Sequence, residues 1–305
     1  MILSGGRSVT AFGIQNALFS SMWTRDFSND YGAVAPVMGR NTLLTVAFST
    51  EWLPYNQFKN PNPSFANVKL LSIKPDDGTV LQTFDIPLRE EYRSPPYSNI
   101  QIGDVLYLDC GWHVAAINST SGAVIWESQP LARKNELKPL FMYSSSIIPA
   151  GDTLLYCLDT KMVALDRITG EFLWEYVLPE MPDEYYVGSE MRIVILDHIV
   201  IIAGLHEIHG VHAQSGEKMW VYSAPDPKLT IFSSPPILYA HTILIGRCDL
   251  DVDSARYAIS GITPSTGTEV YREYIDFRLS GNPVIAENML YCWNDDSLLQ
   301  VSLYS

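Results

Sequence analysis

The sequence predicts an all-β fold, a β-propeller of four-stranded antiparallel blades, with seven blades favoured over six. Three observations support this prediction. A glycine-centred unit recurs along the chain, an aromatic residue follows the glycine at a fixed distance in most copies, and no segment keeps a helical i, i+3, i+4, i+7 apolar pattern for three turns. We expect one domain spanning 1–305.

The repeat becomes visible when the chain is aligned on its turn glycines, which are Gly78, Gly122, Gly170, Gly216 and Gly267. They follow one another at intervals of 44, 48, 46 and 51 residues. An interval of this size suits a blade of four short strands, and an apolar hairpin before each unit supplies the first two of them. The spacing therefore predicts one blade per interval.

Each copy of the unit has the same local pattern. A strand of alternating apolar residues reaches a polar turn, where glycine supplies a positive φ. A second strand then carries an aromatic side chain four residues after the glycine, which is Trp126, Trp174, Trp220 or Tyr271. A large flat side chain repeated at one position predicts packing between neighbouring blades.

The two ends of the chain leave the number of blades open. Residues 1–28 read as the last three strands of one blade, and residues 279–305 as the first three strands of another. If both stand alone there are seven blades, and the pair ILSGG and SVTAF, which reads as two strands, favours this count. If the strand around Trp23 completes the C-terminal blade, there are six.

Composition and charge exclude some classes of partner. A chain of 305 residues with 47% hydrophobic residues can bury a large core by itself, so a monomer is the default expectation. Its formal net charge of −14 repels nucleic acid and anionic membranes. The longest apolar stretch, 193–205, is interrupted by Asp197 and His198 and is too short to span a bilayer. We expect neither a nucleic-acid partner nor a membrane span.

The N-terminus, MILSGGRSVTAFGIQ, lacks the basic start and unbroken apolar stretch of a secretory signal. Taken as written, this predicts a cytoplasmic protein, and a periplasmic or extracellular one is the alternative if the N-terminus is processed or truncated. The four cysteines form no CxxC pair and lie at the ends of apolar runs, so free thiols are favoured over disulfides.

One copy of the repeat carries a full motif. Ala164, Asp166, Gly170 and Trp174 match the pattern A-x-D-x-x-x-G-x-x-x-W. This pattern resembles the tryptophan-docking repeat of the quinoprotein (PQQ)-like β-propellers, and the resemblance covers most of the chain. It implies the fold, but it implies little about function, because such propellers serve as dehydrogenases, assembly scaffolds and sensor domains.

The other copies depart from the motif to different degrees. Asn118 takes the Asp place in one copy, and Gly210 and His212 take the Ala and Asp places in another. In the two weakest copies, Tyr271 or Gln82 stands where Trp belongs.

The resemblance also implies what a quinone-dependent enzyme of this kind would need, namely a vicinal cysteine pair, a calcium site and an aspartate base. The sequence has no vicinal cysteine pair and no CxxCH haem motif, and it lacks GxSxG, GxxxxGK and HExxH motifs. We therefore expect no cofactor and favour a non-catalytic protein over an enzyme. An enzyme or a carbohydrate- or small-ligand-binding propeller that uses the central channel stays open, as does the propeller part of a larger sensor or dehydrogenase.

A metal site is weakly indicated by Asp249, Asp251 and Asp253, which have the D-x-D-x-D opening of many calcium loops. The segment lacks the glycine and the distal glutamate of an EF-hand loop, so a solvated hairpin tip is favoured. The HxxHxxH spacing that includes His209 also suggests a metal, but side chains alternate across a strand, and His209 would point away from the other two histidines. We expect no bound metal.

The largest departure from the repeat is the insertion 51–67, between the second and third strands of blade two. Aromatic residues among prolines and asparagines are typical of recognition loops. In a propeller this connection lies on the same face as the blade-to-blade crossovers, including 89–97 and 179–187. We predict that this face binds a protein partner, and a loop that folds back over its own blade is the equally weighted alternative. The predicted apolar anchors and charged rim are Trp52, Tyr55, Phe58, Glu90, Glu91, Asp183 and Glu184.

Overall fold

The structure, a computed structural model, describes residues 2–4, 8–15, 18–27, 31–33, 36–39, 41–49, 68–89, 98–110, 113–131, 147–158, 161–178, 192–204, 206–224, 230–250, 255–294 and 297–302. These residues form strands and their connecting turns. None of the described ranges holds a helix that is long and apolar enough to cross a membrane.

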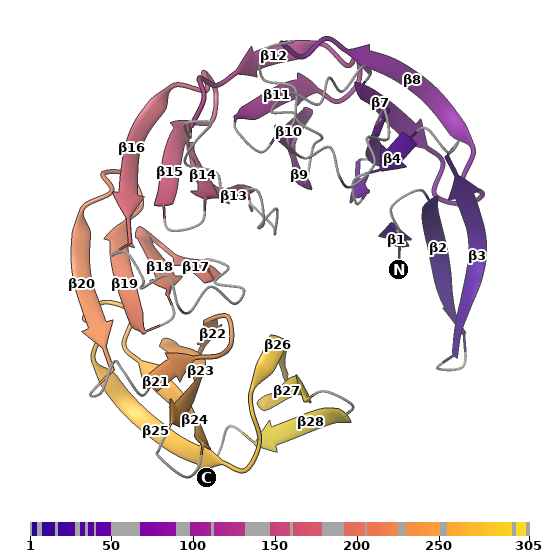
Figure 1. Cartoon of the computed structure of the whole chain (residues 1–305). Helices are drawn as coiled ribbons and strands as arrows, with labels where there is room; N and C mark the ends of the chain where they lie inside the picture. The colour runs from indigo at the N-terminus through magenta and orange to yellow at the C-terminus, as the bar shows by residue number, and fades with distance from the viewer. Residues whose placement is uncertain are drawn as a thin grey trace, which may run out of the picture. The chain divides into compact units, whose positions relative to one another are not determined.

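The chain divides into two compact units. The first consists of Met1–Cys157 with Val163–Leu173, and the second of Leu158–Met162 with Trp174–Ser305. Seven antiparallel sheets follow one another along the chain (Figure 1). The prediction of an all-β propeller fold with seven blades is confirmed, because the strand around Trp23 pairs within its own N-terminal sheet and does not complete the C-terminal one. The expectation of a single domain stays a prediction.

The first unit holds three whole sheets. The first sheet has the order β1-β2-β3, the second β4-β6-β7-β8 with β5 also on β6, and the third β9-β10-β11-β12. The strands are β1 (Ile2–Ser4), β2 (Ser8–Gln15), β3 (Leu18–Asp26), β4 (Tyr31–Ala33), β5 (Val37–Met38), β6 (Leu43–Ser49), β7 (Val68–Ile73), β8 (Val80–Ile86), β9 (Ser98–Ile102), β10 (Val105–Asp109), β11 (Val114–Asn118) and β12 (Val124–Glu127).

The fourth sheet has the order β13-β14-β15-β16, and the boundary of the two units passes through it. The second unit continues with β17-β18-β19-β20, then β21-β23-β24-β25 with β22 also on β23, and then β26-β27-β28. The strands are β13 (Ile147–Ala150), β14 (Thr153–Leu158), β15 (Lys161–Asp166), β16 (Phe172–Val177), β17 (Arg192–Leu196), β18 (Ile199–Ala203), β19 (Glu207–His212), β20 (Lys218–Ser223), β21 (Thr230–Phe232), β22 (Ile237–Tyr239), β23 (Thr242–Leu250), β24 (Ala255–Ile262), β25 (Glu269–Ile275), β26 (Ser280–Ala286), β27 (Met289–Asn294) and β28 (Ser297–Ser302).

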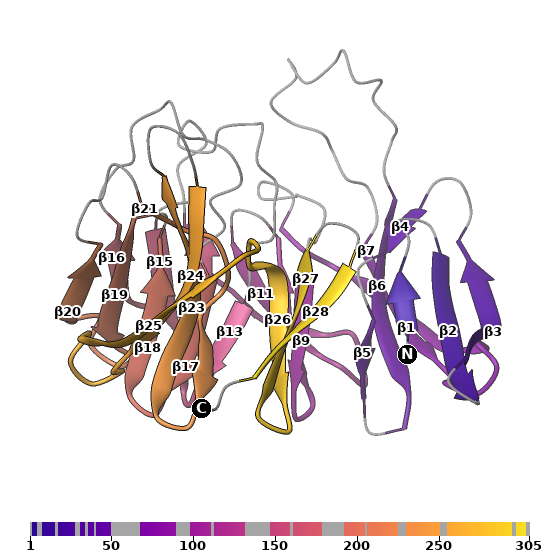
Figure 2. The same cartoon turned by 90° about the horizontal axis from the view of Figure 1, so that it is seen from below.

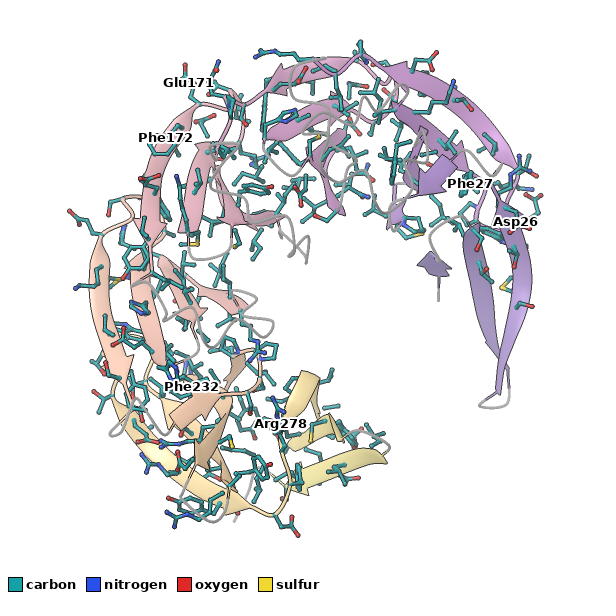
Figure 3. The ribbon with its side chains drawn as sticks, viewed as in Figure 1. Asp26, Phe27, Glu171, Phe172, Phe232 and Arg278 are labelled. Carbon is teal, nitrogen blue, oxygen red and sulfur yellow. The ribbon has the colours of Figure 1, made fainter. Side chains whose placement is uncertain are left out.

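The core lies between successive sheets. In the second unit, Ile201 of β18, Ile208 of β19 and Ile245 of β23 belong to one buried cluster that also contains Phe232. Strands β18, β19, β23 and β24 supply most of this cluster, and each of them is paired with a strand on either side. Figure 3 labels Phe232 in this interior and Phe172 at the start of β16, where the Phe172 ring points away from β15 and is exposed.

Five outer strands carry the same irregularity. The pairing register between the third and outer strands shifts by one residue immediately before the aromatic position, as between Gly210 and Val211 opposite Trp220. The extra residue in the outer strand forms a β-bulge, which bends the strand locally. The bulged residues are exposed and apolar, namely Met22, Leu81, Ile125, Met219 and Val270.

Candidate functional site

The predicted partner-binding residues lie outside the described residues. The insertion that carries Trp52 falls between β6 and β7, and the crossovers that carry Glu90 and Asp183 follow β8 and β16. The same holds for the other predicted anchors and rim residues, which are Tyr55, Phe58, Glu91 and Glu184. Their role as a binding face stays a prediction, and what the structure details is the set of junctions that hold the sheets together.

An aromatic ring on a glycine forms the first kind of junction. Trp126 of β12 lies on Gly170, the turn glycine of the next sheet, so that a Cβ built on Gly170 would lie 2.4 Å from Cε3 of the indole. Gly170 also has φ +74°, a conformation that other residues rarely adopt. Both the lack of space for a Cβ and the positive φ require glycine at this position. The turn glycine of each repeat therefore makes room for the aromatic ring of the preceding repeat.

The same arrangement recurs in the second unit. Trp174 lies on Gly216, and Trp220 lies on Gly267, with a built Cβ 2.6 Å and 2.4 Å from the nearest indole atom. Both indoles are 8% exposed. Trp220 also donates a hydrogen bond from Nε1 to the carbonyl oxygen of Pro264, at 2.8 Å. Each indole therefore joins its own sheet to the turn of the next one.

Two further rings occupy this position without fitting the sequence motif. Trp23 of β3 lies on Gly78 and donates from Nε1 to the carbonyl of Pro75 at 2.7 Å. Phe84, two residues after Gln82, lies on Gly122. Side chains two apart on a strand share a face, which is why Phe84 can replace an aromatic at the place of Gln82. In the sequence, only the aromatic residue itself could have marked Trp23 as a copy of this position, because no turn glycine precedes Trp23.

The polar residue at the start of the turn accepts hydrogen bonds from the turn backbone. Asp166 Oδ1 accepts from the N–H groups of Ile168 and Thr169, both at 2.8 Å. These bonds hold the pKa of the Asp166 carboxyl below its usual value. Asn118 makes equivalent bonds through its Oδ1, and His212 accepts from Ser215 through Nδ1 at 3.3 Å. Aspartate, asparagine and histidine at the Asp place thus all accept hydrogen bonds from backbone N–H groups of the turn.

A tyrosine, a histidine and a glutamate form a polar junction between β16 and β19. The Tyr176 hydroxyl lies 2.8 Å from Nδ1 of His209, and Nε2 of the same ring lies 3.4 Å from Oε2 of Glu207. Ser223 donates to the other Glu207 oxygen at 2.8 Å. Burial lowers the pKa of His209, and Lys218 adds to this effect, while Glu207 opposes it. The arrangement fits a neutral imidazole with its proton on Nε2.

A second polar junction gathers around Glu269 of β25. Tyr222 of the preceding sheet donates to Glu269 at 2.9 Å, and Ser260 donates to it at 2.8 Å. Arg272 donates through its guanidinium to both carboxylate oxygens. Burial alone would raise the pKa of Glu269, but these hydrogen bonds hold it below its usual value. Arg247, whose side chain is buried, places its NH1 3.6 Å from the same carboxylate.

One of the three aspartates that weakly indicated a calcium site, Asp249, lies beside this junction. Asp249 binds the guanidinium of Arg247, with Oδ1 2.9 Å from Nε. Asp251 and Asp253 lie outside the described residues. A carboxylate already bound to a buried arginine is a poor ligand for a cation. Within the described ranges, no group of three or more His, Cys, Asp or Glu side chains could hold a metal ion. The ring centroids of His198 and His212 lie 5.6 Å apart, with the two rings tilted by 51°.

A third group of buried polar side chains belongs to the first unit. The Tyr156 hydroxyl donates to the buried Asp109 at 2.7 Å, and His113 lies 3.3 Å from Glu127. Burial would raise the pKa of Glu127, but bonds from His113 and from the Arg89 backbone N–H hold it below its usual value. These polar groups, like those of the second unit, bond to one another across successive strands and sheets.

The four cysteines are free, as predicted, and all four are buried. Burial raises the pKa of the Cys157 thiol to about 12, and burial also holds the pKa of the Cys110 thiol well above its usual value. A thiol that stays protonated is a weak nucleophile, so neither of these two side chains is activated for chemistry.

The seven sheets and the rings that lie on turn glycines define a β-propeller protein of the PQQ-like repeat class. The comparison with protein families identifies the particular family within this class. The chain belongs to the family described as outer membrane protein assembly factor BamB, whose model matches residues 20–204 and 111–256. The predicted resemblance to quinoprotein-like repeats is confirmed by this match.

Solved structures share the fold. The chain is similar to the crystal structure of BamB from Moraxella catarrhalis, with a TM-score of 0.60, 11% identity, and coverage of 98% of this chain and 80% of that one. It is also similar to a europium-containing methanol dehydrogenase, with a TM-score of 0.57, 10% identity, and coverage of 99% and 74%. At these identities the similarities concern the fold alone. No curated protein matches the sequence.

Proposed function

We propose that the chain is a non-catalytic scaffold that binds a protein partner through the face bearing the insertion 51–67. Membership of the family described as an outer membrane protein assembly factor carries this proposal. The junctions support it, because the Tyr176, His209 and Glu269 side chains bond to neighbouring strands and sheets instead of converging on an open site. Side chains used in this way stabilise a rigid support for loops.

The same family description bears on the compartment. It names a factor of outer-membrane assembly, which is a setting outside the cytoplasm. The expectation of a cytoplasmic protein is not supported by this match, and we favour the alternative, a periplasmic or extracellular protein. Cys110 and Cys157 are compatible with an oxidising compartment, because buried thiols with a raised pKa react slowly.

A pair of substitutions in the insertion tests the scaffold. We expect Trp52→Ala with Tyr55→Ala to abolish recovery of a partner by affinity capture, while the melting temperature stays unchanged. Phe172→Ala is the matched control, because Phe172 is an exposed aromatic on an outer strand, away from the insertion in the sequence. It should leave both partner recovery and the melting temperature unchanged. A large fall in melting temperature for the insertion variant would instead show that the loop covers its own sheet.

A further inference from the structure

Two histidines lie together at one end of the fifth sheet, in which β17, β18, β19 and β20 follow one another (Figures 1 and 2). His198 lies in the two-residue turn between β17 and β18, and His212 is the last residue of β19. Because Ile199 pairs with His212, the strand register places this turn beside the end of β19. The carbonyl oxygen of His198 also accepts a hydrogen bond from the N–H of Ala213 at 2.8 Å. The backbone therefore fixes where the two imidazoles stand.

The same two positions hold oxygen-bearing side chains in the two preceding sheets. In the fourth sheet they are Asp152 and Asp166, and the carbonyl oxygen of Asp152 accepts the equivalent hydrogen bond, from Arg167. The guanidinium of Arg167 also lies 3.3 Å from the Asp152 carboxylate. In the third sheet the two positions are Asp104 and Asn118. The fifth sheet has histidine at both positions and alanine at the place of Arg167, so it offers two imidazoles beside a turn that lacks this positive charge.

The turn after β19 engages one nitrogen of His212. Nδ1 lies 3.1 Å from Oγ of Ser215 and accepts a longer bond, at 3.3 Å, from the Ser215 N–H. If Nε2 binds a metal ion, the ring proton moves to Nδ1, which gives up the longer bond and donates to Oγ of Ser215. Histidines that bind metals usually donate their other N–H in this way, and the bond orients the ring. Ser215 is therefore placed to support His212 as a ligand through Nε2.

The separation of the two rings suits a single ion. Imidazole nitrogen binds a transition-metal ion at about 2.0–2.1 Å, so two rings on one tetrahedral ion have centres about 5 Å apart. The centroids of His198 and His212 are 5.6 Å apart, and a small rotation of the exposed His198 side chain closes the difference. Among the residues that the structure describes, no third His, Cys, Asp or Glu joins this pair to complete a metal site. Water would fill the other coordination positions, and the ion would exchange readily.

We propose that His198 and His212 form an exchangeable site for one divalent transition-metal ion, with Cu²⁺ bound more tightly than Zn²⁺. Imidazole suits both ions, and Cu²⁺ forms the more stable complexes with nitrogen ligands. The net charge of −14 attracts cations to the protein surface. The ion links the β17–β18 turn to the end of β19. Because His212 begins the turn whose Gly216 contacts the indole of Trp174, the bound ion stabilises this docking contact as well.

Titration calorimetry of the full chain with copper sulfate, and separately with zinc chloride, tests the site. We expect one site of highest affinity per chain, with Cu²⁺ bound about tenfold more tightly than Zn²⁺ or better. His198→Ala and His212→Asn should each weaken Cu²⁺ binding by about tenfold or more, because each removes one of the two nitrogen ligands. Asparagine is the replacement at His212 because Asn118 makes the turn bonds at the same place in the third sheet.

His241→Ala is the matched control. His241 lies in the β22–β23 turn, at the place that His198 holds in the β17–β18 turn, and it is exposed like His198. Thr263 stands at the place of His212 in that sheet, so His241 has no second imidazole at the paired position. This variant should bind Cu²⁺ as the wild type does. Zinc chloride should raise the melting temperature of the wild type and of His241→Ala, and it should leave that of His198→Ala unchanged.

Three results would overturn the proposal. They are absence of saturable binding of either ion, Cu²⁺ affinity that His198→Ala leaves unchanged, and equal weakening by His241→Ala. If His212→Asn lowers the melting temperature without metal, His198→Ala decides the matter, because the exposed His198 ring takes no part in the turn that contains Gly216. No partner polypeptide is involved in these measurements, so their outcome is independent of the proposed scaffold function.

Discussion

The phenolic oxygen of Tyr176 lies 2.8 Å from Nδ1 of His209, and this contact joins the outer strand of one sheet to the third strand of the next. Tyr222, which also follows its tryptophan by two residues, donates a hydrogen bond to Glu269 on β25, the outer strand of the next sheet. In both cases a tyrosine two residues after the docking indole reaches a titratable group. The junctions therefore combine a buried apolar contact with a polar one that depends on protonation.

Acid should weaken the junction at His209. The folded environment lowers the pKa of this side chain, chiefly through burial. The unfolded chain therefore takes up a proton first, near the ordinary value of 6.5, and the free energy of unfolding falls as the pH decreases below that value. His209→Gln should show a smaller loss of stability than the wild type between about pH 7 and pH 5. Urea titrations at several pH values measure this. Equal slopes for variant and wild type would show that His209 does not contribute.

Removing a docking indole should strongly destabilise the protein. Trp174→Ala is expected to lower the free energy of unfolding by roughly 3–5 kcal/mol, because the indole is almost fully buried on Gly216. Phe172→Ala, two residues earlier on the same strand and 56% exposed, should change it by less than about 0.5 kcal/mol. Chemical denaturation compares the two. A similar effect of both substitutions would contradict the packing of Trp174.

The turn glycines allow backbone strain and steric clash to be separated. Gly151 has φ +65° and open space around its Cβ position, whereas Gly170 has φ +74° and the Trp126 ring in that position. Gly151→Ala should cost about 1–2 kcal/mol for the backbone alone. Gly170→Ala should cost a further 1–3 kcal/mol or so, because the indole must move. If calorimetry gives the same loss for both, Trp126 does not rest on Gly170 in solution.

Neutralising the carboxylate at the second junction should be costly. Glu269→Gln removes the negative charge that binds Arg272 and lies near the buried Arg247, and it should lower the free energy of unfolding by roughly 2–3 kcal/mol. Glu175→Gln is the control. Glu175 forms an ion pair with Lys161 on the surface, and its loss should cost less than about 1 kcal/mol. A small effect at Glu269 would mean that solvent reaches this junction and screens it.

The sequence by itself determined the features that depend on local chemistry. The turn glycines, the apolar alternation and the spacing of Trp126, Trp174 and Trp220 predicted the strands and one sheet per repeat interval, because positive φ and the period of a strand are properties of a few consecutive residues. The full motif at Asp166 and Gly170 was sufficient to indicate the family for the same reason.

Only the tertiary structure decided which residues meet across the sheets. The contact of Phe84 with Gly122 and the bond between Tyr176 and His209 join residues that are dozens of positions apart. Asp249 belongs to the aspartate run that weakly indicated a calcium site, but it binds Arg247, whose burial the run itself does not indicate. Such choices follow from burial and from the register between strands. The order of residues in the sequence indicates neither burial nor register, because side chains pack with those that are near in space.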